Sequence, residues 1–176
     1  ASRVIQDLEL AGNAHEFIDE FPFFSYLLGD LHAHVLSMPF VLLGIAVAWN
    51  TFRGGWDGGQ KVLGFPLYLQ GRGLLCAAWV LGGLAFLNTW DILPLAALVL
   101  AAFLFRRVQQ QGWHAARLEE TLALAIPLAL LSFLLYLPFY LGFASQAGGI
   151  LPNLVAATRG IDLWVMFAPL FIPLFA

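Results

Sequence analysis

Long uncharged apolar runs, separated by two short basic stretches, constrain the fold of this chain more than any other feature. Val35 to Phe52 holds 18 residues without a charge, close to the roughly 20 that a helix needs to cross the apolar core of a membrane. Only 11% of all residues are charged, whereas soluble domains average about 25%. We therefore expect an all-α fold, a polytopic transmembrane helical bundle.

The basic residues predict how this bundle is oriented. Six of the eight Lys and Arg residues lie between Arg53 and Arg72 or between Arg106 and Arg117. Short loops that carry Lys and Arg stay in the cytoplasm, so both stretches are expected there. The polar segments 29–34, 88–91 and 136–149 would then share the extracytoplasmic face of the plasma membrane.

Gly73 to Phe105 decides the number of crossings, because these 33 residues contain one charge, Asp91. A single helix would place Arg72 and Arg106 on opposite sides, whereas two helices return both to the cytoplasm. Asn88 and Asp91 are also residues that favour helix caps. The sequence therefore predicts a tight turn at residues 88–91.

Two further apolar runs bring the expected total to about five membrane spans. The fourth span follows Glu120 and ends near Tyr136, and the fifth begins at Leu163. Residues 35–176 would form the transmembrane region. The first residue is not Met and Ala176 lies within an apolar run, so we expect a fragment of a longer chain, with membrane lipid and the remaining chain or other subunits as partners.

Residues 1–34 are expected to form an external, acidic and aromatic juxtamembrane segment. The apolar spacing of Val4, Ile5 and Leu8 is typical of a short helix, and the aromatic and acidic residues from Phe17 onward favour a helix on the membrane surface. Residues 63–69 are expected to lie along the opposite interface. The formal net charge of −3 argues against a nucleic-acid partner, because no basic face could neutralise phosphates.

Asp30, His32 and His34 form the first candidate site, since ionisable groups at a membrane boundary are costly to retain without a function. Asp30 could be a general base, with a histidine orienting or protonating a neighbouring group. Asp30 and His34 could instead bind a divalent metal ion, or Asp30 could cap the first span and pair with His34. On a helix His32 points away from the other two, so only an extended or broken backbone would bring all three together.

The second candidate site is the predicted turn with Asn88 and Asp91. Asp91 either caps the following helix or contributes to a polar substrate pocket shared with the Asp30 segment. Tyr140 and Gln146 border the third polar segment and could donate hydrogen bonds to a polar substrate. We treat Asn88, Asp91, Tyr140 and Gln146 as candidate substrate-binding residues.

Three sequence blocks carry a resemblance to known proteins: Glu20 to His34, Leu84 to Asp91 and Tyr136 to Tyr140. They resemble the YYY family of uncharacterised multipass membrane proteins from Chloroflexota and archaea. That family is remotely similar to the GT-C superfamily of membrane glycosyltransferases, which includes protein mannosyltransferases, aminoarabinose transferases and oligosaccharyltransferases.

The resemblance implies a GT-C-like fold and transfer of a sugar from a polyprenyl-phosphate donor at the outer membrane face. It implies that an acidic residue of an external loop acts as base or metal ligand, and Asp30 is the matching position. The earlier external acid of those enzymes is expected upstream of Ala1. Two alternatives stay open, a membrane transporter and a noncatalytic subunit that packs through the Gly82-Gly83 face.

Overall fold

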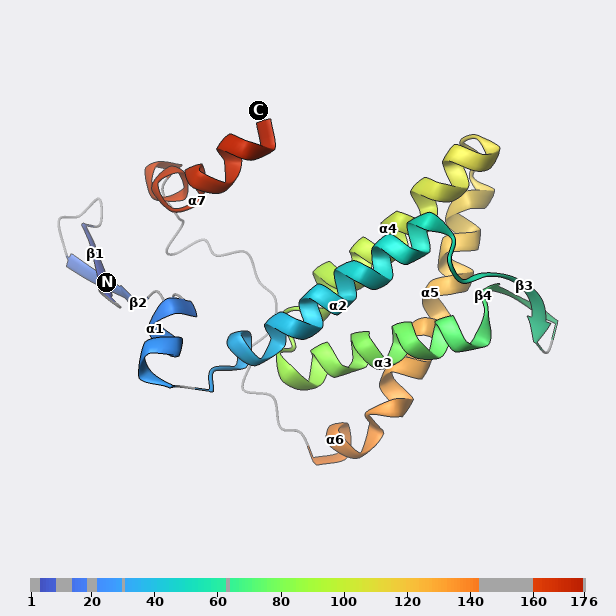
Figure 1. The fold of residues 1–176 in the computed structure, drawn as a ribbon, viewed down its shortest axis with the longest axis horizontal. Coiled ribbons are helices and arrows are strands. Elements are labelled where there is room, and N and C mark those ends of the chain that lie inside the picture. The colour runs from blue at the N-terminus through green and yellow to red at the C-terminus, as the bar shows by residue number, and fades with distance from the viewer. Residues whose placement is uncertain are drawn as a thin grey trace. The chain divides into compact units, whose positions relative to one another are not determined.

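The computed structural model describes residues 4–8, 14–18, 22–29, 31–62, 64–142 and 160–175. Residues 1–142 form one compact unit, and residues 143–176 form a second. The described chain is mostly helical. In the first unit four helices pack together (Figure 1): α2 (Ala33–Arg53), α3 (Gly71–Leu87), α4 (Ile92–Gln111) and α5 (Ala116–Leu135).

Three of these helices, α2, α4 and α5, are long and apolar enough to cross a membrane. Helix α3 is also apolar but has 17 residues. In the second unit, α7 (Gly160–Phe175) has 16 residues and covers most of the run predicted as the last span. The bundle of membrane-spanning helices is thus confirmed in its coarse form, and the number of five spans stays a prediction.

The predicted turn at residues 88–91 is confirmed. Helix α3 ends at Leu87, and Asn88 has an extended backbone with φ of −151° and ψ of 102°. The amide of Asp91 donates to the carbonyl oxygen of Asn88 at 3.0 Å, which closes the turn before α4 begins. Residues 73–105 are therefore two helices, and the basic residues that flank them lie at the same end of the bundle.

The expectation of helices in the first 18 residues is wrong. Strands β1 (Val4–Leu8) and β2 (Ala14–Ile18) form an antiparallel hairpin in which Val4 pairs with Ile18 and Leu8 with Ala14. Val and Ile favour extended backbone because their branched side chains pack well on a pleated surface. The short helix α1 (Pro22–Leu28) follows in the aromatic segment.

A second antiparallel hairpin, β3 (Asp57–Val62) with β4 (Phe65–Leu69), connects α2 to α3. The sequence analysis had predicted no strand here and had placed residues 63–69 along the interface, so the expected all-α class is corrected to a mostly helical chain with two small hairpins. Gly64 turns the chain between the strands with φ of 85°, a conformation that glycine adopts without a steric penalty.

Helix α3 is the most enclosed of the four because small residues let its neighbours approach closely. Ala77 and Ala78 are fully buried. A Cβ atom on Gly82 would lie 2.7 Å from the carbonyl oxygen of Ser132 on α5, so only glycine fits this crossing. Small residues at helix interfaces are typical of membrane bundles, in which van der Waals packing drives association.

The outward faces of α2 and α5 carry exposed large apolar side chains, including Trp49, Leu122, Ile126 and Leu130. Only 28% of the most apolar window of α2 and 17% of those of α4 and α5 are buried within the chain. Such continuous apolar surface is far larger than soluble monomers expose. Lipid is the environment that satisfies it.

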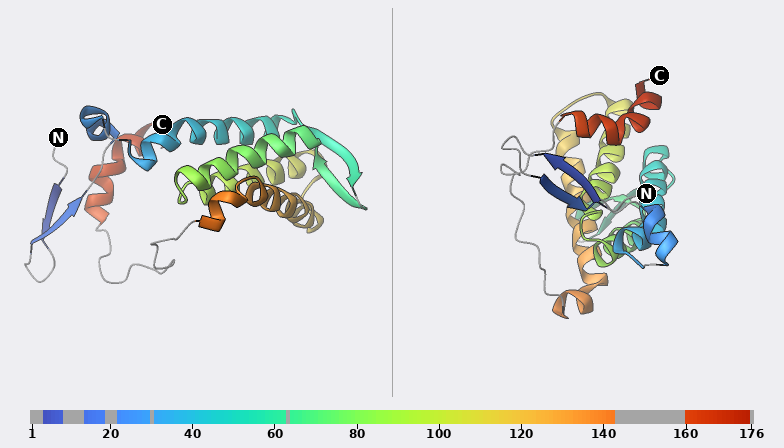
Figure 2. Two further views of the ribbon diagram at one scale, coloured as in Figure 1. Left: turned by 90° about the horizontal axis from the view of Figure 1, so that it is seen from below. Right: turned by 90° about the vertical axis from the view of Figure 1, so that its left-hand side faces the viewer.

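Ion pairs join the helices at the end of the bundle that carries the basic stretches, which we call the cationic end. Arg106 of α4 pairs with Asp57 and also donates to the carbonyl oxygen of Phe52 at 3.3 Å. Arg107 Nε lies 2.7 Å from Glu120 Oε2, and Arg117 pairs with the other carboxylate oxygen of Glu120. In Figure 2 the β3–β4 hairpin adjoins this same end.

Candidate functional site

Asp91 lies at the N-cap position of α4, but its carboxylate does not cap the helix. Its Oδ2 atom accepts a hydrogen bond from Ser37 Oγ of α2 at 2.6 Å and another from Asn88 Nδ2 at 3.0 Å. Ser37 is 1% exposed. The alternative in which Asp91 merely caps α4 is therefore wrong, and its carboxylate instead connects the α3–α4 turn to the first turns of α2.

His32 and His34 lie side by side where α2 begins. Helix α2 starts at Ala33, and its N-cap residue is His32, with an extended backbone of φ −67° and ψ 143°. This break in the helix brings the two imidazole rings to a centroid distance of 5.0 Å. An extended backbone at this position is the condition under which we expected His32 and His34 to lie on the same side. The N-cap position is not that of Asp30, and Asp30 itself lies outside the described residues.

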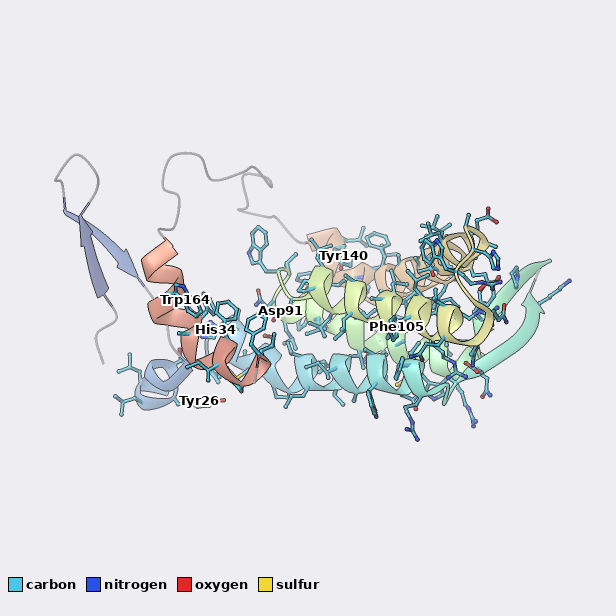
Figure 3. All side chains as sticks on the ribbon, turned by 90° about the horizontal axis from the view of Figure 1, so that it is seen from above. Tyr26, His34, Asp91, Phe105, Tyr140 and Trp164 are labelled. Carbon is cyan, nitrogen blue, oxygen red and sulfur yellow. The ribbon has the colours of Figure 1, made fainter. Side chains whose placement is uncertain are left out.

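One nitrogen of His34 is available for chemistry. Its Nε2 atom is buried and has no hydrogen-bond partner among the described residues. Ser37 follows His34 by three positions, and residues with this spacing share a helix face. His34, Ser37, Asn88 and Asp91 thus occupy one region, which we call the polar site; Figure 3 labels His34 and Asp91.

Ser37 is the residue that the sequence analysis missed. A lone serine in an apolar run more often bonds to a carbonyl of its own helix, and Ser37 Oγ is indeed 2.9 Å from the carbonyl oxygen of His34. Its position three residues after a candidate histidine was the only local signal. Its bond to Asp91, 54 residues away, depends on how α2 and α4 pack.

Tyr140 borders a cavity between α4 and α5. Tyr140 lies in the short helix α6 (Leu137–Gly142), and its ring packs on Phe133 of α5 at a centroid distance of 4.8 Å. The cavity has a volume of about 310 Å³ and runs between α4 and α5. Its lining is apolar apart from Tyr140 and Ser132, and Ser132 Oγ is buried without a partner in the described part of the chain.

Ile92, the residue after Asp91 in the sequence, lines this cavity, whereas His34, Ser37, Asn88 and Asp91 do not. A pocket shared by Tyr140 with Asn88 and Asp91 stays a prediction. Gln146, the remaining candidate for substrate binding, lies outside the described residues.

Comparison with known proteins places the chain in a family. Residues 1–176 match the family described as uncharacterized membrane protein (DUF2298). The chain belongs to this family. No curated protein and no solved structure matches it. The family description identifies a membrane protein, which agrees with the three helices that are long and apolar enough to cross a membrane.

A metal centre in this DUF2298 protein stays a prediction. Among the described ranges, which omit residue 30, no three His, Cys, Asp or Glu side chains gather closely enough to hold a metal ion. The predicted ligand pair consists of Asp30 and His34, and only His34 is described. The Nε2 atom of His34 is buried without a partner among the described residues, and neutral imidazole nitrogen is a common metal ligand.

Proposed function

We propose that this protein is a membrane glycosyltransferase-like enzyme that transfers a sugar from a polyprenyl-phosphate donor at the extracytoplasmic face of the plasma membrane. The observation that carries the proposal is the polar site. It combines a carboxylate, held between helices, with a buried imidazole nitrogen that has no partner among the described residues. An imidazole nitrogen can take the proton of a hydroxyl group, and a fixed carboxylate can orient that group by accepting a hydrogen bond.

In the proposed reaction an acceptor hydroxyl oxygen forms a bond to C1 of the donor sugar. The bond from C1 to the phosphate oxygen breaks, and its electron pair leaves with the polyprenyl phosphate. Asp30 or His34 takes the proton of the acceptor hydroxyl. A divalent metal ion held by Asp30 and His34 is the alternative role, and it would supply charge neutralisation at the departing phosphate.

Asp91 suits a substrate-orienting role in this reaction. Among the described residues, both hydrogen bonds to this carboxylate, from Ser37 and Asn88, end on Oδ2, and in the proposal Oδ1 accepts a hydrogen bond from a sugar hydroxyl. Because Ser37 is buried, the carboxylate is held in one position before substrate binds. Such preorganisation lowers the entropic cost of orienting a substrate.

The apolar cavity between α4 and α5 supports a lipid-linked donor. It follows α4 from Ile92 to Leu100, a distance of roughly 12 Å along the helix axis. In the proposal an isoprenoid chain lies on this lining, which is apolar apart from Ser132 and Tyr140, and the phosphate lies near Tyr140. Gly82 and Gly83, by contrast, pack on Tyr136 of the same chain, so this face gives no support to the alternative of a noncatalytic subunit.

The test is transfer of radiolabelled sugar from polyprenyl phosphate by the full-length protein in membranes. We expect His34→Gln and Asp30→Asn each to lower the rate by about 10²-fold or more, the usual loss of a general acid–base group. His114→Gln is the matched control, because His114 is exposed in the loop at the cationic end. Undiminished transfer by both site variants would refute the assignment.

The metal alternative is separated by chelation. Dialysis against EDTA should abolish transfer, with recovery on adding Mn²⁺ or Mg²⁺, if Asp30 and His34 hold a metal ion. If Asp30 is instead a general base without a metal, transfer by the dialysed protein should be unchanged and should fall at low pH as the carboxylate is protonated.

A further inference from the structure

An open groove lies on the surface of the bundle, between the first half of α3 and the end of α5. Its volume is about 570 Å³, and its lining residues are Arg72, Leu75, Cys76, Trp79, Leu135 and Tyr136. Arg72, Cys76 and Trp79 follow one another at helical spacing along one face of α3. The groove therefore has a cation at one end and an apolar floor that extends roughly 10 Å along the helix.

The floor of the groove is fixed by contacts within the chain. Tyr136 donates its hydroxyl hydrogen to the carbonyl oxygen of Trp79 at 3.1 Å. Cys76 is exposed, and Trp79 is 67% exposed. This apolar surface thus faces outward from a bundle that belongs in a membrane.

Arg72 is positioned at the end of this groove without an acidic partner. Its Nε donates to Gln70 Oε1 at 3.1 Å, and Gln70 Nε2 donates in turn to the carbonyl oxygen of Asp57 at 3.2 Å. The guanidinium Nη atoms make no ion pair with any described carboxylate, whereas Arg106 and Arg107 both do. Within the described part of the chain, Arg72 thus stands at the mouth of an apolar groove without a carboxylate partner, held through Gln70 on the β3–β4 hairpin.

We propose that this groove binds an anionic membrane phospholipid, with the phosphate on Arg72 and one acyl chain along Cys76 and Trp79 to Tyr136. The charge is complementary, because an unpaired guanidinium binds a phosphate bidentately. Arg72 lies at the cationic end, where basic residues near a membrane surface attract anionic headgroups. The site is separate from the polar site at the opposite end and does not depend on the proposed enzyme activity.

Cys76 is the only cysteine of the chain, which provides a direct test. The full-length protein, with any cysteine outside these 176 residues replaced by Ala, is reconstituted in phosphatidylcholine vesicles with increasing fractions of phosphatidylglycerol, and the rate of Cys76 modification by a membrane-permeant maleimide is measured. We expect phosphatidylglycerol to slow the modification. For Arg72→Gln, half-protection should require about fivefold more phosphatidylglycerol, which corresponds to the roughly 1 kcal/mol that one basic residue contributes at an anionic surface.

Lys61→Gln is the matched control, because Lys61 is an exposed cation of the same hairpin that does not line the groove. It should leave the protection of Cys76 unchanged. Native mass spectrometry should show a phosphatidylglycerol molecule retained by the wild type and lost from Arg72→Gln. Equal modification rates in both lipids, protection that survives Arg72→Gln, or protection by inorganic phosphate alone would each overturn the proposal.

Discussion

Replacing Ser37 by Ala should loosen the junction between α2 and the α3–α4 turn. Ser37 Oγ lies 2.6 Å from Asp91 Oδ2, and with 1% exposure of Ser37 water cannot replace the lost donor. A hydrogen bond to a charged group contributes about 1.5–3 kcal/mol, but bonds between membrane helices average about 0.6 kcal/mol. Because Asn88 still donates to Asp91, we expect Ser37→Ala to lower the free energy of unfolding by about 1–2 kcal/mol.

The assay is a double-mutant cycle of Ser37→Ala and Asp91→Ala, measured by reversible unfolding in mixed micelles. The coupling energy should be about 1 kcal/mol, as expected for side chains in direct contact. Thr89→Ala with Asp91→Ala is the control cycle, because the hydroxyl of Thr89, in the α3–α4 turn, donates to the carbonyl oxygen of Ala85 in α3 at 3.2 Å. A Ser37–Asp91 coupling no larger than that of the control would refute the bridging role of Asp91.

Two further variants test the packing at the middle and at the cationic end of the bundle. Gly82→Val should destabilise the protein by about 1–3 kcal/mol, the usual cost of overpacking, because its Cβ would lie 2.5 Å from a ring carbon of Tyr136. Equilibrium unfolding measures this change. An unchanged unfolding midpoint would contradict the close approach of α3 and α5. Glu120→Gln should cost about 1.5–3 kcal/mol, since this carboxylate accepts from Arg107 and Arg117. Glu119→Gln is its control and should change stability by less than about 0.5 kcal/mol; equal effects of the two substitutions would contradict the bridging of α4 and α5 by Glu120.

Most of the helical bundle could be predicted from the sequence, because apolar runs and basic residues report directly on a membrane environment. The uncharged run at residues 35–52 corresponds to α2, and the positions of Arg72 and Arg106 were sufficient to place a turn at residues 88–91. Apolar residues lie in the membrane and basic residues lie in water because of the solvent around them, not because of tertiary packing. Local sequence is therefore enough to predict where these helices begin and end.

The parts that sequence reasoning missed depend on contacts between distant segments. Val4, Ile5 and Leu8 fit a helical period equally well, and only pairing with residues 14–18 decides for a strand. The same holds for Ser37, whose bond to Asp91 follows from the packing of α2 on α4. No local pattern of residue types shows which residue of α2 lies opposite Asp91.

The orientation of the bundle is tested most directly by thiol labelling from each side of the membrane. With Cys76 replaced by Ala, single cysteines are introduced at Trp90 and Trp113, which lie in loops at opposite ends and are each 62% exposed. In intact spheroplasts, an impermeant maleimide should label Trp90→Cys at once and Trp113→Cys only after permeabilisation. Labelling of both from the outside, or of Trp113→Cys alone, would contradict a polar site at the extracytoplasmic face.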